Sequence, residues 1–151
     1  VGDGPEKKYY QRLAEKYNLS AYVKFFPNQT GDDLDKLYGQ ADIALASFGF
    51  YKAGVYHSNS SLKVCECLAK GLPFATGCSI SGIEDTCPFM LLFPNNKSTV
   101  DIHQIVVWFE KLWNRKGNKE EMAKSIRGFA EKNFDMSVVM RPIIQYSGIS
   151  E

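Results

Sequence analysis

The pattern of apolar and polar positions predicts short helices and strands that alternate along the chain. Two segments, 21–26 and 41–47, are rich in apolar, aromatic or β-branched residues and predict strands. Apolar residues at helical spacing predict helices at 5–18 and 30–38. The second strand (ADIALAS) is apolar at almost every position, which is typical of a parallel strand covered on both faces. With Val1-Gly2 as the end of a strand whose beginning lies outside the sequence, this alternation predicts an α/β domain with a mostly parallel sheet.

The segment 59–77 (NSSLKVCECLAKGLPFATG) predicts a helix that leads into a buried strand at 74–76. Asn59 or Ser60 can cap the amino end of this helix, and Gly71 fits the left-handed position that follows a helix. Charged residues fall on one arc of the helix, and apolar residues, which should face a core, fall on the opposite arc. The charged arc holds Lys63, Glu66 and Lys70, and the apolar arc holds Leu62, Val64, Cys65, Leu68 and Ala69.

The remainder of the chain predicts one more strand followed by three helices. Apolar residues there first form a short continuous run and then recur at helical spacing. The expected elements are a loop at 79–85, a strand at 89–93, a helix from Thr99 or Asp101 to about 116, and helices at 120–132 and 136–146.

Composition and charge exclude several classes of protein. The 151 residues are enough for one domain with a sizeable core, and the 44% hydrophobic content is ordinary for a globular protein. A net charge of +1 gives no signature of nucleic-acid binding, and no apolar run approaches the roughly 20 residues that span a bilayer. Cys65, Cys67, Cys78 and Cys87 lack paired C-x-x-C spacing, which argues for a reducing compartment without disulfides. With only two histidines we also expect no metal site.

The amino end of the helix predicted in 59–70 has the chemistry of a pyrophosphate site. Free backbone N–H groups and Lys63 suit an anion there, and Glu66, one turn later, can accept hydrogen bonds from sugar hydroxyls. In open α/β sheets ligands bind outside the carboxyl ends of the strands, which places the loop 48–58 at the expected cleft and the segment 26–28 near a base. The alternative is an ordinary wet helix face on which Lys63 and Glu66 form a solvated pair.

Three motifs resemble the carboxyl-terminal nucleotide-sugar site of GT-B glycosyltransferases. They are G-D-G-P at residues 2–5, S-L-K-x-x-E-x-L-A-K-G-L-P-F-A-T at 61–76, and F-D-M-S at 134–137. Their order and spacing are closest to the large retaining group with the GDGP loop, so the resemblance covers essentially the whole chain. It implies a three-layer, Rossmann-like α/β domain with a mostly parallel sheet, which is half of a GT-B fold.

The resemblance implies a hexosyltransferase-like enzyme of bacterial polysaccharide biosynthesis that transfers a sugar from a UDP- or GDP-sugar to a glycan or polysaccharide. Residues 1–151 would then be a single donor-binding domain that lacks its first strand and the amino-terminal acceptor domain, and we expect it to be inactive alone. Family members usually work without a bound metal, and no cofactor is expected beyond the nucleotide sugar.

The resemblance also implies roles for individual residues. Glu66 matches the glutamate that holds the ribose hydroxyls, and Lys63 matches a lysine that reaches the diphosphate. Ser58 departs from the pattern, because many members carry a second glutamate there that contacts the donor sugar. No catalytic residue is assigned. The further candidate donor-binding residues are Gly4, Pro27, Asn28, His57, Ser58, Ser61 and Leu62.

We expect the partners to be a nucleotide sugar and, through the missing domain, a glycan or lipid-linked acceptor, but no nucleic acid. We expect a cytoplasmic location at the inner face of the membrane, with peripheral membrane association of the full-length protein. The last helix should expose Val138, Val139, Ile143 and Ile144, because it would pack on the missing domain. Two alternatives stay open, a GT-B sugar-nucleotide epimerase and a non-catalytic degenerate partner domain. A receiver-like module is disfavoured because it needs clustered acidic residues at strand ends.

Overall fold

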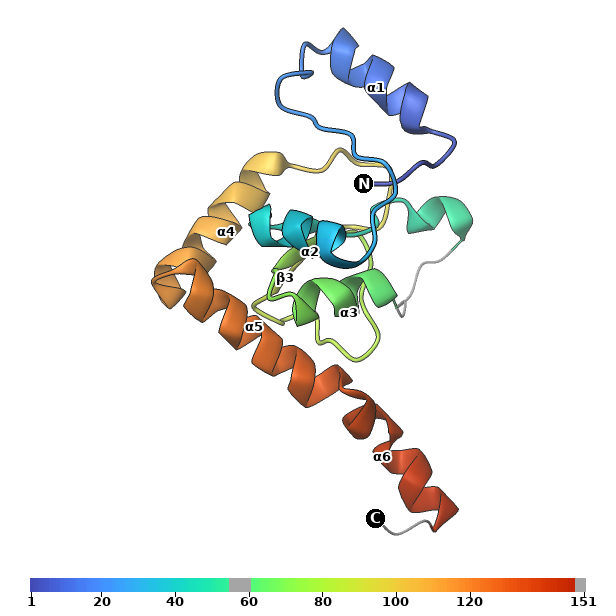
Figure 1. Ribbon diagram of the computed structural model, residues 1–151, viewed down its shortest axis with the longest axis vertical. Coiled ribbons are helices and arrows are strands. Elements are labelled where there is room, and N and C mark those ends of the chain that lie inside the picture. The colour runs from blue at the N-terminus through green and yellow to red at the C-terminus, as the bar shows by residue number, and fades with distance from the viewer. Residues whose placement is uncertain (55–60, 149–151) are drawn as a thin grey trace. The chain divides into compact units, whose positions relative to one another are not determined.

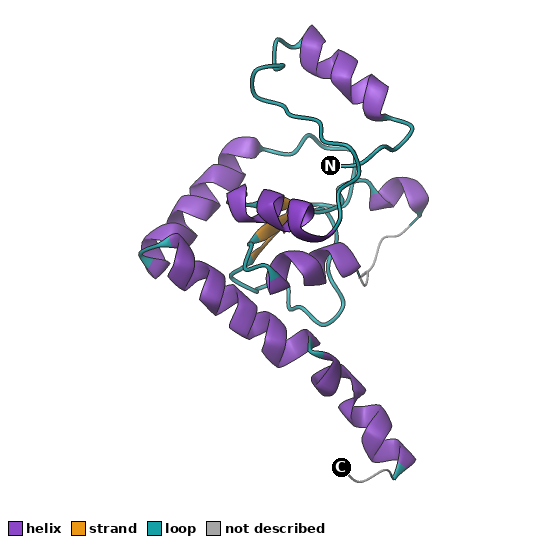
Figure 2. Ribbon diagram, viewed as in Figure 1, coloured by secondary structure: helices purple, strands orange, loops and turns teal. Residues whose placement is uncertain are grey.

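The structure is a computed structural model that describes residues 1–54 and 61–148 (Figure 1). The chain forms two compact units, residues 1–40 and 41–151. Helices predominate over strands, as Figure 2 shows in purple and orange. Along the described ranges, no helix is both long enough and apolar enough to cross a bilayer.

The first unit consists of two helices, α1 (Lys7–Lys16) and α2 (Gly31–Gln40), joined by an irregular segment. The strand predicted at 21–26 is wrong, since no residue of that segment has strand geometry. A hydrogen bond from Gly2 N to Phe26 O, 3.0 Å long, ties the segment to the start of the chain. One bond is not a ladder, and aromatic residues make a strand only beside a paired neighbour.

The second unit contains a parallel sheet of three strands in the order β1-β2-β3. The strands are β1 (Ala44–Leu45), β2 (Phe74–Thr76) and β3 (Met90–Leu92). Strand β2 pairs with both neighbours and is buried at every position, as predicted. Strand β1 is shorter than the predicted 41–47, and the prediction that it is covered on both faces is wrong, since its Leu45 is 55% exposed.

Over the described residues of the second unit, four α-helices and one 3₁₀ helix accompany the sheet. They are η1 (Phe50–Ala53), α3 (Leu62–Ala69), α4 (Ile102–Lys116), α5 (Lys119–Phe134) and α6 (Met136–Ser147). The predicted helices are confirmed within a few residues, and η1 lies in a segment predicted as loop. Asp101, Asn118 and Asp135 cap α4, α5 and α6 with side-chain oxygens that accept hydrogen bonds from backbone N–H groups.

Both faces of β2 are covered. Phe74 lies in a buried cluster with Val64 and Leu68 of α3 and with Met122 and Ile126 of α5. Its neighbour Ala75 faces a second cluster, with Phe93 and Ile105 of α4. Because successive side chains of a strand point to opposite faces, helices lie on both sides of the sheet.

The buried face of α3 differs from the predicted apolar arc. Val64 and Leu68 are buried as expected, but Cys67 is also buried, whereas Leu62 is 87% exposed. The added Cβ of an alanine at Gly71 would lie 2.7 Å from Ala123 Cβ, so α5 packs tightly at the carboxyl end of α3. Leu62, at the opposite end of α3, gains no cover from that contact.

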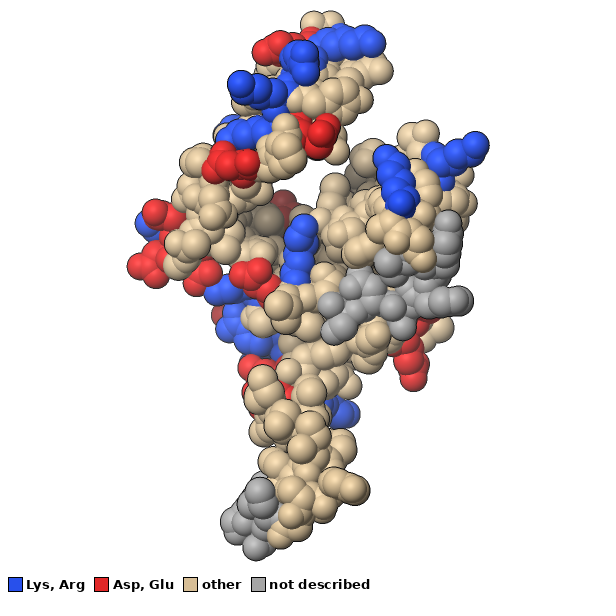
Figure 3. All heavy atoms as spheres, turned by 90° about the vertical axis from the view of Figure 1, so that its right-hand side faces the viewer, with Lys and Arg blue, Asp and Glu red and all other residues tan. Residues whose placement is uncertain are grey.

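The exposure predicted for the last helix is confirmed for Val139 and Ile143, whereas Val138 and Ile144 are half-buried. No residue of α6 is buried, and Val139 and Ile143 are 52% and 58% exposed. In Figure 3 the lowest part of the molecule, formed by α6, carries mostly uncharged side chains. Elsewhere on that face, basic and acidic side chains are interspersed.

We predict that Gly71→Ala destabilises the chain strongly. Gly71 has φ 75° and follows α3 in a Schellman turn, in which Leu72 N donates to Cys67 O. Adding a Cβ costs about 1–2 kcal/mol for the left-handed backbone and about 1–3 kcal/mol more for crowding against Ala123.

Gly54→Ala is the control, because Gly54 has φ 71° and nothing within 4 Å of an added Cβ. The free energy of unfolding of Gly54→Ala should fall only by the cost of the left-handed backbone, about 1–2 kcal/mol. Denaturant titration of both variants compares the losses, and equal values would show that the contact with Ala123 is unimportant.

Candidate functional site

Hydrogen bonds tie the exits of β1 and β2 together at the carboxyl edge of the sheet. Gly77 N donates to Ser47 O at 3.1 Å, and Cys78 N donates to the Thr76 Oγ1 at 3.3 Å. The Thr76 hydroxyl is fully buried and lies within hydrogen-bonding distance of the carbonyls of Ser47 and Cys78. Gly77 also passes close to Phe48, where an added Cβ would lie 3.0 Å from the Phe48 Cα. The chain therefore leaves this edge, where ligands of open α/β sheets bind, from a fixed position.

Helix α3 begins at Leu62, with Ser61 at the N-cap position. Ser61 makes no side-chain capping bond, but its carbonyl accepts from Val64 N at 3.0 Å and Cys65 N at 3.2 Å. The predicted caps, Asn59 and Ser60, lie outside the described residues. Since the helix provides no acceptor for the N–H groups of Leu62 and Lys63, they can donate to an anion.

Lys63 and Glu66 are both exposed on α3, one turn apart. Within the part of the chain that the structure describes, no ion pair joins their side chains. The exposure of both side chains agrees with the alternative of an ordinary wet helix face as well as with a ligand site. Both charges are available to a ligand.

Glu66 lines a groove of about 440 Å³ between α3, α5 and the start of α6. Phe134, Asp135 and Met136 of the F-D-M-S motif line the same groove, so the fold brings together residues that are almost 70 positions apart. Hydrogen bonds from the hydroxyl and the N–H of Ser137 lower the pKa of Asp135, which caps α6. The groove is lined by Cys65, Glu66, Ala69, Arg127, Ala130, Glu131, Phe134, Asp135 and Met136, and Lys63 does not reach it.

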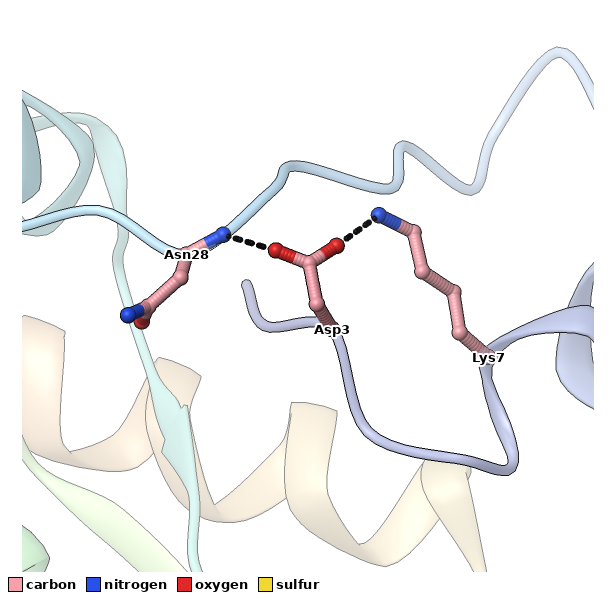
Figure 4. Close-up of polar contacts among 3 residues, drawn as sticks. All are labelled: Asp3, Lys7 and Asn28. Atoms are coloured by element: carbon pink, nitrogen blue, oxygen red, sulfur yellow. Dashed lines mark hydrogen bonds and ion pairs between the residues drawn. The ribbon is translucent and has the colours of Figure 1, made fainter.

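In the first unit, Asp3 joins the G-D-G-P loop to the segment that was predicted to lie near a base (Figure 4). Asp3 Oδ2 accepts from Asn28 N at 2.7 Å, and Asp3 Oδ1 accepts from Lys7 Nζ at 2.7 Å. The hydrogen bonds from Lys7 and then from Asn28 lower the pKa of Asp3. The predicted site residues Gly4, Pro27 and Asn28 therefore lie on two connected segments.

The predicted site residues fall into three groups. Gly4, Pro27 and Asn28 belong to the first unit, and Ser61, Leu62, Lys63 and Glu66 belong to the second. His57 and Ser58 lie outside the described residues. Sequence reasoning missed Asp3 as a site residue, although the G-D-G-P motif contains it. In the described ranges, no cluster of three or more His, Cys, Asp or Glu could hold a metal ion.

Comparison with known proteins identifies a family and a similar fold. The model of the family "Glycosyl transferases group 1" matches residues 1–85. A solved structure titled "Crystal structure of GtfA/B complex" matches with a TM-score of 0.62 and 19% sequence identity. The match covers 95% of this chain but 27% of that chain, so this chain spans about a quarter of its length. It confirms the predicted Rossmann-like α/β fold, half of a GT-B architecture. No curated protein matches.

We predict that Thr76→Val weakens the carboxyl edge of the sheet. Valine has nearly the shape of threonine but removes the acceptor of the buried Cys78 N–H, which should cost about 1–3 kcal/mol in unfolding free energy. Thr86→Val is the control, since Thr86 is exposed, and it should stay within about 0.5 kcal/mol of the original protein. Thermal and denaturant unfolding measure both, and an unchanged stability for Thr76→Val would contradict the role of this hydroxyl.

Proposed function

Because this chain belongs to the glycosyl transferases group 1, we propose that it is the nucleotide-sugar-binding half of an enzyme that transfers a sugar from a UDP- or GDP-sugar to a glycan or polysaccharide. Within the family it resembles the large retaining group with the GDGP loop, and we infer a hexosyl donor. The structural match covers 95% of this chain but only 27% of the solved chain, so the acceptor domain is proposed to lie elsewhere in the full protein.

The observation that carries the proposal is the exposed pair of charges on α3, a helix followed directly by the central strand β2. Lys63 and the N–H groups at the start of α3 provide positive charge for a diphosphate. Glu66 provides carboxylate oxygens that accept hydrogen bonds from the ribose hydroxyls. One helix thus carries complementary groups for two neighbouring parts of a nucleoside diphosphate.

The same groups support the chemistry of transfer. In the proposed reaction, the bond between the anomeric carbon of the donor and the diphosphate oxygen breaks, and an acceptor hydroxyl forms the new bond to that carbon. Negative charge develops on the leaving diphosphate, and Lys63 with the amides of α3 stabilises it. The reaction therefore needs neither a bound metal nor a further cofactor. The proton of the acceptor hydroxyl passes to a base that remains unassigned.

The whole protein is proposed to bind its glycan or lipid-linked acceptor through another domain and to act in the cytoplasm at the inner face of the membrane. In this proposal residues 1–151 bind the donor but do not turn it over alone. A sugar-nucleotide epimerase would use the same donor site, and incubation of the full protein with donor alone, without acceptor, distinguishes it from a transferase.

A second candidate function is a non-catalytic partner domain, which Ser58 favours because many family members carry a sugar-binding glutamate at that position. Failure of the protein to bind UDP or GDP would support this alternative. Binding of either nucleotide would support the donor-binding function.

We predict that Lys63→Ala and Glu66→Ala have separable effects on nucleotide binding. Glu66→Ala should weaken uridine or guanosine and the corresponding diphosphate equally, by about 1.5–3 kcal/mol, because it contacts the ribose that both contain. Lys63→Ala should weaken only the diphosphate. Its effect should shrink as salt rises, because added ions screen an exposed ion pair. Calorimetric titration at two salt concentrations measures both.

Glu121 and Lys124 provide the matched control, because they form another exposed acidic and basic set at i, i+3 spacing on α5. Their alanine variants should bind every ligand as the original protein does. Unaltered affinities in the Lys63 and Glu66 variants as well would leave these residues as surface charges and remove the main support for the proposed function.

A further inference from the structure

We propose that Asn95 is a positioning residue of the donor site, which holds η1 at the carboxyl edge of the sheet so that Lys52 of η1 serves as a second cation for the diphosphate. This inference rests on the proposed function, because it concerns the same nucleotide. Every residue that supports it belongs to the second unit.

The start of α3, the helix η1 and Asn95 share one edge of the sheet. A short turn joins α3 to β2, and Val64 and Leu68 of α3 pack with Phe74 of β2. Because a helix that packs on the strand directly after it runs antiparallel to that strand, α3 begins at the carboxyl end of β2. Strands β1 and β3 run parallel to β2, and η1 and Asn95 follow their carboxyl ends. In open α/β sheets this is the edge at which ligands bind.

The backbone that leads from β1 to η1 is held in place by packing. The ring of Phe48 lies edge-on to the ring of Phe93, with 5.9 Å between the centroids. An added Cβ at Gly77 would lie 3.0 Å from the Phe48 Cα, so the chain after β2 passes directly against Phe48. The segment that precedes η1 is thus fixed against the exits of β2 and β3.

Asn95 makes the hydrogen bond that holds η1 itself. Tyr51 N donates to Asn95 Oδ1 at 3.0 Å, in a partly buried bond between residues 44 positions apart. The backbone bonds from Lys52 N to Gly49 O and from Gly54 N to Tyr51 O are local to η1. Local bonds shape the helical turn but do not place it on the sheet. The position of η1 at the edge therefore depends on Asn95.

Lys52 is the charged side chain of η1. It is exposed, and over residues 1–54 and 61–148 no ion pair joins it to a carboxylate. A nucleoside diphosphate carries more than one negative charge, whereas Lys63 supplies one positive charge. A lysine binds phosphate as a point charge on a flexible stem, so it needs the right edge rather than a rigid geometry. Lys52 meets that requirement as long as η1 stays in place.

The competing explanation is that Asn95 serves only the fold. A partly buried hydrogen bond stabilises a loop whether or not a ligand exists. The two explanations differ in how Asn95 and Lys52 combine. If Asn95 acts on the ligand through Lys52, its removal has no further effect on affinity once Lys52 is gone. A purely structural Asn95 shows no such dependence.

The variants are Lys52→Ala, Asn95→Ala and the double variant. One control is Lys111→Ala, which removes the same charge from an exposed position of α4. The other is Asn96→Ala, which removes a neighbouring asparagine whose Oδ1 accepts from Ser98 N at 2.8 Å, a bond that stays within its own loop. Thermal unfolding of each variant sets a titration temperature at which all are folded.

The experiment titrates the complete protein with UDP, GDP, their nucleosides and inorganic pyrophosphate by calorimetry. For the nucleotide that the unsubstituted protein binds, Lys52→Ala should lose affinity about three- to fivefold, the scale of an exposed ion pair. Pyrophosphate should weaken similarly and the nucleoside should be unchanged. At about 1 M salt, where the Debye length is about 3 Å, the difference should nearly vanish. Asn95→Ala should show a loss of the same kind, no larger than that of Lys52→Ala. The double variant should match Lys52→Ala, and both controls should match the unsubstituted protein.

Three outcomes would overturn the inference. Unchanged diphosphate affinity in Lys52→Ala would show that this cation does not meet the ligand. A double variant that loses the product of the two single losses would show that Asn95 acts independently of Lys52. An equal loss in Lys111→Ala would show an effect of net charge alone. If the protein binds UDP or GDP through Lys63 but not Lys52, only this inference fails. If the unsubstituted protein binds neither nucleotide, the proposed function fails and the inference fails with it.

Discussion

The rest of the second unit depends on the burial of strand β2 between two parallel neighbours. Phe74, Ala75 and Thr76 are excluded from water on both faces, and hydrogen bonds join β2 to β1 and to β3. Because a buried backbone must be paired, this strand fixes the register of the sheet. Its carboxyl end, where Thr76 and Gly77 bind Ser47, then fixes the edge from which the loops leave.

The turn that connects α3 to β2 fixes the position of α3, and with it the charged residues of the candidate site, relative to the buried strand. Gly71, with φ 75°, ends the helix next to Ala123 of α5, and β2 follows within three residues. Helix α3 is therefore held against a packed core, while Lys63 and Glu66 remain exposed on it. In the function proposed for this member of the glycosyl transferases group 1, Lys63 serves the phosphates of a donor nucleotide and Glu66 accepts hydrogen bonds from its ribose.

Local patterns in the sequence predicted most of the second unit and less of the first. The spacing of apolar residues located α3, β2 and the three later helices, and Asp101 was one of the two predicted caps of α4. The strand at 21–26 failed because its aromatic residues signal a strand only where a neighbour pairs with it. The exposure of Leu62 and the burial of Cys67 depend on where α5 crosses α3. The spacing of apolar residues along the sequence gives no information about that crossing. Asp3 was missed because its bond to Asn28 spans 25 positions and follows no periodicity. The groove lined by both Glu66 and Met136 also arises from tertiary packing, which local sequence patterns do not predict.

The central claim, that a nucleoside diphosphate binds at the amino end of α3, is tested most directly by amide chemical-shift mapping of the complete protein during titration with UDP and GDP. The account predicts that one of them perturbs the N–H resonances of Leu62 and Lys63 most strongly, with a smaller change at Glu66, and that the changes saturate together. Saturating nucleotide that leaves the α3 resonances unchanged, or perturbs only a distant groove such as that around Asp42 and Trp113, would contradict it.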